Sequence, residues 1–490
     1  MSDGAGNIAG KLPMRVKLIA GFGSIAFGVK DSGFSFFLLI FYNQVLGMDA
    51  GLVSLALLIA LLADAVVDPI IGNLSDRTYT RWGRRLPWLY AAPVPLAFLW
   101  VLLWSPPEGA APSFAGLVGI AIGVRVLLSA CEVPSISLVP ELTADYDERT
   151  TLFRYRYLSG WMGGLLTMVL AYTVFMPGPQ GLLRIDGYQA FGIFGAGLMA
   201  VSVIGSAIGL HPLVAHLPDH KPPPFSVSGV FGEIVEAFSE RSFLIFAAGG
   251  LAAYIVQGMT FSMSNYLNLF VWQVSQGQLM LYPLLLLASV VLMFVVVGPM
   301  HARFGKARSA AWSALLAPVI GMVPYALLLA GVWPQPGSNA STAGFYSFLL
   351  FGNTLGIVSL VSATSMMAEI VEAFEERTGR RAEGSFYSGN WLIQKCATGA
   401  GIFITGQIIA LAGLATNAAP GSVPKDVIAT LVLCFGGVSL VLAVVSAFWL
   451  ARFPISREQH EARLERLAHD RKGVLDEAAR ADPDAHAIGM

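Results

Sequence analysis

Two aspartates, Asp64 and Asp68, lie inside the otherwise apolar run DAVVDPIIG. At an i, i+4 spacing on a helix, both carboxylates project from one face, about one turn apart. Two carboxylates this close do not both ionise cheaply in a dry site unless a cation or a proton lies between them. The pair therefore predicts a charge-coupled site for Na⁺ or H⁺. The structural alternative is that Asp68 pins the helix beside Pro69, while Asp64 pairs with Arg125 or Lys395.

Further charged residues also fall within apolar stretches. A charge at the bilayer centre costs a few kcal/mol and is by default a functional-site hypothesis. Besides the acid pair, the candidates are Lys30, Asp31, Arg125, Glu132 and Lys395. Arg125 and Glu132 are at i, i+7 and share one helix face. The acids of this set exceed the bases by one charge. Such a nearly balanced site has less need of a sodium ion, so proton coupling remains open.

Composition indicates what kind of protein holds these charges. Of 490 residues, 55% are hydrophobic and 12% charged, with a mean hydropathy of +0.66, whereas an average soluble domain is about 25% charged. So little charge cannot cover a soluble globule of this length, which predicts a multi-pass membrane protein. The three cysteines and seven histidines have no metal-site spacing. We expect no enzyme and no cofactor, because the sequence also lacks a nucleophile–base signature and a nucleotide loop. We also expect no cleaved signal peptide, because the N-terminus has no short apolar core followed by a small-residue cleavage site.

Apolar runs of about 20 residues or more predict an all-α protein with twelve transmembrane helices in two six-helix bundles. The expected spans are 16–46, 50–75, 88–106, 113–140, 153–177 and 189–212, then 242–272, 278–300, 309–333, 343–368, 386–416 and 426–450. The corresponding domains are an N-terminal bundle at 1–212, a proline-rich cytoplasmic linker at 213–241, a C-terminal bundle at 242–450 and a cytoplasmic tail at 451–490. Charges of both signs at helical spacing predict a short helix in the tail.

Lysine and arginine set the expected orientation. Nearly all of them fall in one set of loops and termini, whereas the opposite loops hold only Arg184 and Lys425. With an even number of spans, both termini are expected in the cytoplasm. The implied location is a bacterial-type inner (plasma) membrane.

An internal repeat relates the two halves. ELTADYDERT (Glu141–Thr150) is similar to EIVEAFEERT (Glu369–Thr378), and each follows the fourth expected span of its half. GNLSDRTYTRWGRR (72–85) has a weaker counterpart in GPMHARFGKAR (298–308). Parallel repeats of this kind place a transporter's substrate site at the midplane between the halves.

The segment after the second span carries a longer motif, G-x-x-x-D-R followed by G-R-R. Its residues are Gly72, Asp76, Arg77, Gly83, Arg84 and Arg85. Together with DAVVDPIIG, RWGRRLPW, EVPSISLVPELTADYDERT, RTGRRAEGSFYS and Lys395, this motif resembles the glycoside–pentoside–hexuronide:cation symporters of the major facilitator superfamily, typified by melibiose permease. The resemblance covers nearly all of 15–450.

The resemblance implies roles for several charged residues. Asp64 and Asp68 match the aspartates that bind the coupling cation, Lys395 matches a lysine nearby, and Glu132 matches an acid that serves both cation and sugar. Arg156 matches a sugar-contacting arginine if one gap is allowed. Structural alternatives are an interfacial anchor for Arg156 and a salt bridge with Arg125 for Glu132.

The charged cytoplasmic segments are expected to act as latches. Asp76–Arg85 and Glu369–Arg381 mix acids with arginines, so their ion pairs can form in one state and open in another. The second segment contributes Glu369, Glu372, Arg377 and Arg380. The alternative is that these loops only fix the topology.

The chain departs from the family pattern near the expected sugar site. The family's sugar-binding aspartate falls on Gly28, although Asp31 lies three residues later and could replace it. A stacking tryptophan falls on Ile136, and Arg125 stands where the family has a small uncharged residue. Trp391 is an aromatic candidate for stacking on a sugar ring, although such residues also fill cores and interfacial belts.

The predicted function is cation-coupled symport of a sugar, glycoside or related small solute by alternating access, with Na⁺ or H⁺ as the coupling ion. The partners are the solute, a monovalent cation and the lipid bilayer, with no nucleic acid, and the chain is expected to act as a monomer. One alternative keeps the fold and carries an amphiphile such as a lysolipid or a steroid conjugate. Another is a membrane sensor that transports nothing.

Overall fold

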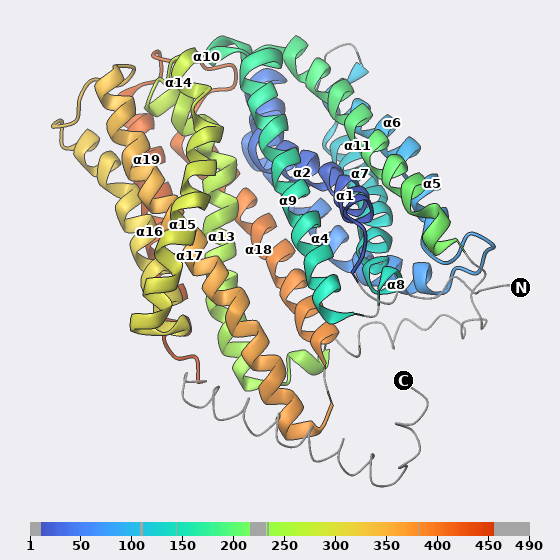
Figure 1. Cartoon of the computed structure of the whole chain (residues 1–490). Coiled ribbons are helices and arrows are strands. Elements are labelled where there is room, and N and C mark those ends of the chain that lie inside the picture. The colour runs from blue at the N-terminus through green and yellow to red at the C-terminus, as the bar shows by residue number, and fades with distance from the viewer. Residues whose placement is uncertain are drawn as a thin grey trace, which may run out of the picture.

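The computed structural model describes residues 11–107, 111–143, 145–215, 232, 235–380 and 382–454, and within these ranges the chain forms helices and connecting turns (Figure 1). The first half contains α1 (Met14–Phe22), α2 (Ile25–Ser32), η1 (Gly33–Phe37), α3 (Leu38–Ile40), η2 (Phe41–Val45), α4 (Ala50–Asp76), α5 (Leu86–Ala91), α6 (Pro93–Trp104), α7 (Phe114–Ser137), α8 (Val139–Leu142), α9 (Tyr146–Leu170), η4 (Ala171–Phe175), α10 (Gly178–Gly181) and α11 (Ile185–Val214). The second half contains α13 (Arg241–Tyr266), η5 (Leu267–Val271), α14 (Gln276–Leu279), α15 (Tyr282–Phe304), α16 (Lys306–Leu329), α17 (Asn339–Thr378), α18 (Glu383–Ala412) and α19 (Lys425–Leu450).

Eleven helical stretches of the described chain are long and apolar enough to cross a membrane. The expected span 88–106 is divided into α5 and α6, because the chain bends at Ala92, next to Pro93. Proline has no backbone N–H and interrupts helical hydrogen bonding. α6 alone, at 12 residues, is shorter than the roughly 20 that a membrane crossing needs.

The two halves form two groups of helices. Figure 1 shows the helices of the first half on one side and those of the second half on the other, with α18 packed against α4 between them. α10 and α14 lie at one end of the molecule and α8 at the other (Figure 1). We call these the Asp49 end and the Asp76 end, after the residues at the two ends of α4.

Glycine allows α18 to approach α4 closely. A Cβ at Gly406 would lie 2.0 Å from the Ser54 Oγ and 2.4 Å from the carbonyl oxygen of Ala50. These distances are far shorter than van der Waals contact, so only glycine fits there. The crossing positions α18, and with it Lys395, against the helix that carries the acid pair.

The structure corrects one expected boundary. Glu369, Glu372 and Arg377 were expected in a cytoplasmic loop, but they lie on α17, which continues to Thr378. α17 ends where Gly379 adopts a left-handed conformation with φ of 68°, which glycine adopts without steric cost. Most of the linker (216–231) and the tail beyond Phe453–Pro454, including its predicted helix, lie outside the described residues.

Candidate functional site

The acid pair of α4 meets a lysine from the other half. Lys395 on α18 places its Nζ 2.8 Å from the Asp64 Oδ2 and 2.5 Å from the Asp68 Oδ2. The Asp64 side chain is only 4% exposed, and that of Asp68 is 23% exposed. Because Lys395 belongs to the second half and the aspartates to the first, this ion pair joins the two halves directly.

A serine bridges the same two carboxylates from the opposite side. The Ser129 Oγ, on α7, lies 2.6 Å from the Asp64 Oδ1 and 2.6 Å from the Asp68 Oδ1. Both carboxylates are therefore held between a hydroxyl and an ammonium group. Ser129 was not predicted from sequence, because an uncharged hydroxyl in an apolar helix does not stand out as an ionisable residue does.

Arg125 adds a second positive charge to the site. Its Nη1 lies 3.5 Å from the Asp64 Oδ2, and its guanidinium carbon is 4.0 Å from the ring centre of Phe34. The guanidinium is buried, and its Nε has no hydrogen-bond partner among the described residues. The sequence left open a pairing of Asp64 with Arg125 or Lys395, and the structure contains both pairs.

A second charged group lies beside the first, on α2 and α7. The Lys30 Nζ is 2.9 Å from the Glu132 Oε2 and 3.3 Å from the Asp31 Oδ1. Lys30 is buried, whereas the Asp31 carboxylate is 70% exposed. Glu132 therefore pairs with Lys30 rather than with Arg125, the partner considered from sequence.

Arg156, on α9, is buried and has no carboxylate partner among the ion pairs of the described chain. Its Nη1 donates to the Ser135 Oγ at 3.0 Å and to the carbonyl oxygen of Ala20 at 3.3 Å. Trp391 is 41% exposed and lies one turn before Lys395 on α18. Trp391 shares α18 with Lys395, and Arg156 on α9 contacts α7, the helix of Ser129 and Glu132. Neither forms a hydrogen bond or an ion pair with the acid pair.

The position where the family's sugar-binding aspartate falls has no room for a side chain. A Cβ on Gly28 would lie 2.0 Å from the carbonyl oxygen of Gly160 and 2.5 Å from the amide nitrogen of Gly164. α2 and α9 therefore cross with their backbones in contact, and an acid at this position would clash. Asp31, one turn further along the same helix, is the exposed carboxylate nearby.

We expect Gly28→Ala to lower the thermal stability of the solubilised protein, because the methyl group must displace backbone rather than a flexible side chain. The cost of overpacking is about 1–3 kcal/mol. Melting followed by fluorescence-detected size exclusion measures it. Gly119→Ala is the matched control, since its Cβ would meet nothing within 4 Å. If both variants melt like the wild type, the tight crossing is wrong.

The motif after α4 forms an ion-pair network within the first half. Arg85 is buried and contacts Asp76, the Ser75 Oγ at 2.6 Å and Glu141 at 3.4 Å. Gly83 has φ of 85°, a conformation that glycine adopts without steric cost, which explains glycine at this turn. Three motif residues remain. A Cβ at Gly72 would lie 3.5 Å from the Val133 side chain, and the Arg77 Nε donates to the Asn73 Oδ1 at 2.5 Å. Arg84 is exposed.

The corresponding segment of the second half forms its own ion pairs. Lys306 contacts Glu369 at 2.8 Å. Arg377 pairs with Glu240 and Arg380 with Glu236. The Lys306–Glu369 pair resembles the Arg85–Glu141 pair of the first half, and Glu369 and Glu141 occupy equivalent positions in the repeat. The ion pairs named here join residues of the first half to each other, and residues of the second half to each other or to the end of the linker.

At the Asp49 end, uncharged polar side chains join the halves. This amide cluster consists of Asn43, Gln44, Tyr172, Asn265 and Tyr266. The Tyr266 hydroxyl donates to the Asn43 Oδ1 at 3.0 Å, and Gln44 exchanges hydrogen bonds with the backbones of Ala415 and Ala418. These residues were not predicted from sequence, although amide side chains within apolar helices are a signal that could have indicated them.

Apolar helices in two bundles, with buried charges joining them, define a membrane transporter. Residues 19–457 match the family model described as MFS/sugar transport protein. The chain thus belongs to the glycoside–pentoside–hexuronide symporter family of the major facilitator superfamily.

Relatives and solved structures agree with this assignment. The uncharacterized symporter sll1374 of Synechocystis sp. is 27% identical, covering 83% of this chain and 87% of that protein. The isoprimeverose transporter of Lactiplantibacillus pentosus is 25% identical (78% and 77% covered), and the putative glycoside/cation symporter YagG of Escherichia coli is 24% identical (97% and 98%). A bacterial homologue of the lysosomal transporter Spinster, solved facing inward, matches the fold with a TM-score of 0.63 at 15% identity, over 90% of this chain and 96% of that one.

Proposed function

We propose that the protein is a secondary active transporter in which a proton drives symport of a sugar, glycoside or related solute by alternating access. The observation that carries the proposal is the contact of Lys395 with Asp64 and Asp68 across the two halves. When two halves that share a buried ion pair separate, each is left with an unpaired buried charge that must be neutralised. Neutralising one carboxylate releases the lysine, so proton binding and movement of the halves become one event.

The charges in the site favour a proton over sodium. Lys395 and Arg125 already place two positive charges beside the two carboxylates. A sodium ion would have to displace the Lys395 ammonium group or add a further positive charge to a buried site. A proton adds no ion and needs only one carboxylate oxygen.

The geometry of Ser129 supports the same choice. Its single hydroxyl hydrogen can be donated to only one of the two carboxylate oxygens that lie 2.6 Å away. When a proton binds to one of the two carboxylates, that group can donate it to the Ser129 Oγ while the hydroxyl donates to the other carboxylate. Ser129 would therefore accommodate the protonated acid pair without a further ligand.

The proposed topology has twelve spans, with α5 and α6 together forming the third. The arginine-rich Asp76 end faces the cytoplasm, together with both termini, in a bacterial-type inner membrane. Because the amide cluster joins the halves at the Asp49 end, the site would open toward the Asp76 end in this conformation. Both halves of one chain supply the site, so a monomer suffices.

The solute would bind beside the acid pair. Glu132 and Arg156 carry hydrogen-bonding groups suited to sugar hydroxyls, and the exposed Asp31 carboxylate lies next to Lys30 in the same region. Trp391 offers an aromatic face for the ring. Since Lys30 pairs with Glu132 at 2.9 Å, a solute hydroxyl that engages Glu132 would alter the charge balance near the acid pair.

We expect proteoliposomes to accumulate a glycoside under an imposed pH gradient, acid outside, and to show no added uptake from a sodium gradient. Radiolabelled uptake across a panel of glycosides measures this. A lysolipid belongs in the panel, because it tests the alternative amphiphile carrier.

Empty liposomes and a potassium gradient serve as controls. Uptake driven by sodium alone would overturn the choice of ion, and uptake driven by neither gradient would remove symport. Accumulation of the lysolipid but of no glycoside would replace the proposed substrate class.

A further inference from the structure

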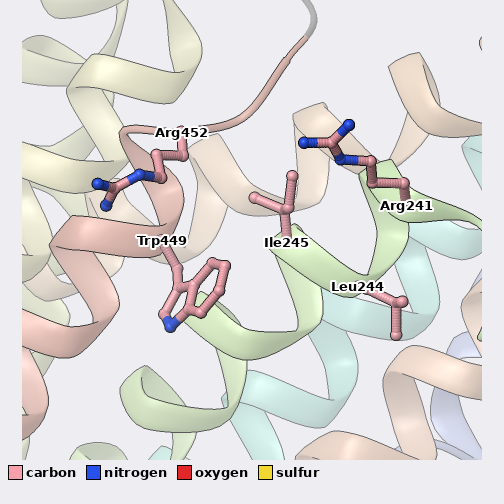
Figure 2. A pocket seen from close by; sticks show the side chains of 5 residues that line it. All are labelled: Arg241, Leu244, Ile245, Trp449 and Arg452. Carbon is pink, nitrogen blue, oxygen red and sulfur yellow. The ribbon is translucent and has the colours of Figure 1, made fainter.

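A pocket remote from the charged site lies between α13 and α19. Its volume is about 500 Å³, and it is lined by Arg241, Leu244, Ile245, Trp449 and Arg452. Figure 2 shows the two arginines on either side of Ile245, with the Trp449 indole and Leu244 below them in this view. The pocket thus has a basic rim and an apolar floor.

The pocket lies at the Asp76 end. α13 runs from Arg241 to Tyr266, and Tyr266 bonds Asn43 in the amide cluster at the opposite end. α19 packs alongside, since the Ser446 Oγ donates to the carbonyl oxygen of Gly249 at 2.9 Å. Arg241 starts one membrane helix and Arg452 follows the end of another, so both lie where a bilayer's headgroups begin.

Neither arginine has a carboxylate partner among the described residues. The acids just before α13 are already engaged, Glu240 by Arg377 and Glu236 by Arg380. Arg452 instead lies over the Phe448 ring, 3.4 Å from its centre. α13 also begins without a side-chain cap hydrogen bond. The local charge is therefore positive and available to an anion.

An apolar surface continues from this basic rim into the membrane. On α19, Val441, Val445 and Phe448 are 64%, 39% and 50% exposed and share one helix face. Arg452, which follows the helix, lies over the Phe448 ring at the end of this face. Leu244 on α13 is also exposed. Basic side chains above an exposed apolar strip match a molecule with an anionic head and hydrocarbon chains.

We infer that this pocket binds the phosphodiester headgroup of an anionic phospholipid, with the acyl chains along the exposed face of α19. The guanidinium groups would donate hydrogen bonds to the phosphate oxygens, and Trp449 would lie at the headgroup level. Basic pockets between membrane helices on the cytoplasmic side are suited to such headgroups. The inference needs the membrane setting but not the proposed transport activity.

The test uses the full chain in nanodiscs that contain equal amounts of phosphatidylglycerol and phosphatidylcholine, with retained lipid counted by native mass spectrometry. We expect wild-type protein to retain phosphatidylglycerol preferentially. Arg241→Gln/Arg452→Gln should lower that preference by roughly thirty-fold, and each single variant by roughly fivefold. The single variants keep the test decisive if the double variant does not fold.

The matched control is Arg303→Gln/Arg308→Gln, which removes two exposed arginines from the same end, one of them also next to a phenylalanine ring. It should retain the wild-type preference. Equal retention of both lipids by wild type, or the same loss in the control, would overturn the site. A third arm adds inorganic phosphate to protein in phosphatidylcholine alone. Arginine-dependent thermal stabilisation by phosphate of the same size as that by phosphatidylglycerol would assign the pocket to a soluble anion and overturn the lipid.

Discussion

Replacing Asp68 with asparagine should abolish accumulation of the solute while leaving its exchange across the membrane intact. Asparagine keeps the shape and the contacts with Ser129 but cannot gain or lose a proton. A potential of 100 mV supplies about 2.3 kcal/mol per charge, enough for a roughly fifty-fold gradient of a neutral solute. We expect the variant to equalise the solute concentration on the two sides of the membrane without building up this gradient. Energised uptake and equilibrium exchange, measured on the same proteoliposomes, separate lost coupling from lost folding.

Asp186→Asn is the control, because that exposed carboxylate pairs only with Arg184 at 2.8 Å among the contacts of the described chain. It should accumulate solute like the wild type. Wild-type accumulation by Asp68→Asn would show that the acid pair has no part in coupling. Folded Asp68→Asn protein that has lost exchange as well would show that Asp68 is needed for more than the proton.

Removing the Lys395 ammonium group should destabilise the protein strongly. Lys395→Ala leaves the buried Asp64 with only the more distant Arg125, and leaves Asp68 without a basic partner in the site. Breaking a buried ion pair from one side costs on the order of 3 kcal/mol or more. We expect a marked fall in melting temperature. Adding Asp68→Asn to Lys395→Ala should recover part of the loss, because it removes one unpaired negative charge.

Lys425→Ala, at the exposed start of α19, is the control and should melt like the wild type. The four melting temperatures of wild type, both single variants and the double variant form a cycle that isolates the coupling between Lys395 and Asp68. A double variant less stable than Lys395→Ala would contradict a direct interaction. So would a Lys395→Ala variant as stable as wild type.

Buried charge was the part of the site that sequence could predict. An ionisable residue in an apolar run is costly, so Asp64, Asp68, Arg125 and Lys395 stood out without any structure. The ion-pair partners of these residues could be predicted only in part. Glu132 lies on one helix face with Arg125, yet it contacts Lys30, because the neighbouring helix brings a closer cation.

Close backbone approaches were not predictable from one sequence. Gly28 and Gly406 stand among many glycines, and only the crossings of α2 with α9 and of α18 with α4 show why these two cannot carry side chains. The helical run from Glu369 to Thr378 was missed because its charges indicate a loop. The charges continue a helix beyond the apolar span, and Gly379 is the first residue that ends it.

We propose that a proton relieves the contact between the acid pair and Lys395 in each transport cycle. The most direct measurement is the external pH of a lightly buffered, sodium-free suspension of de-energised proteoliposomes when a transported glycoside is added. We predict alkalinisation outside wild-type vesicles, in proportion to solute uptake, and none with Asp68→Asn. Solute entry through the wild-type protein without any pH change would show that no proton moves with the solute.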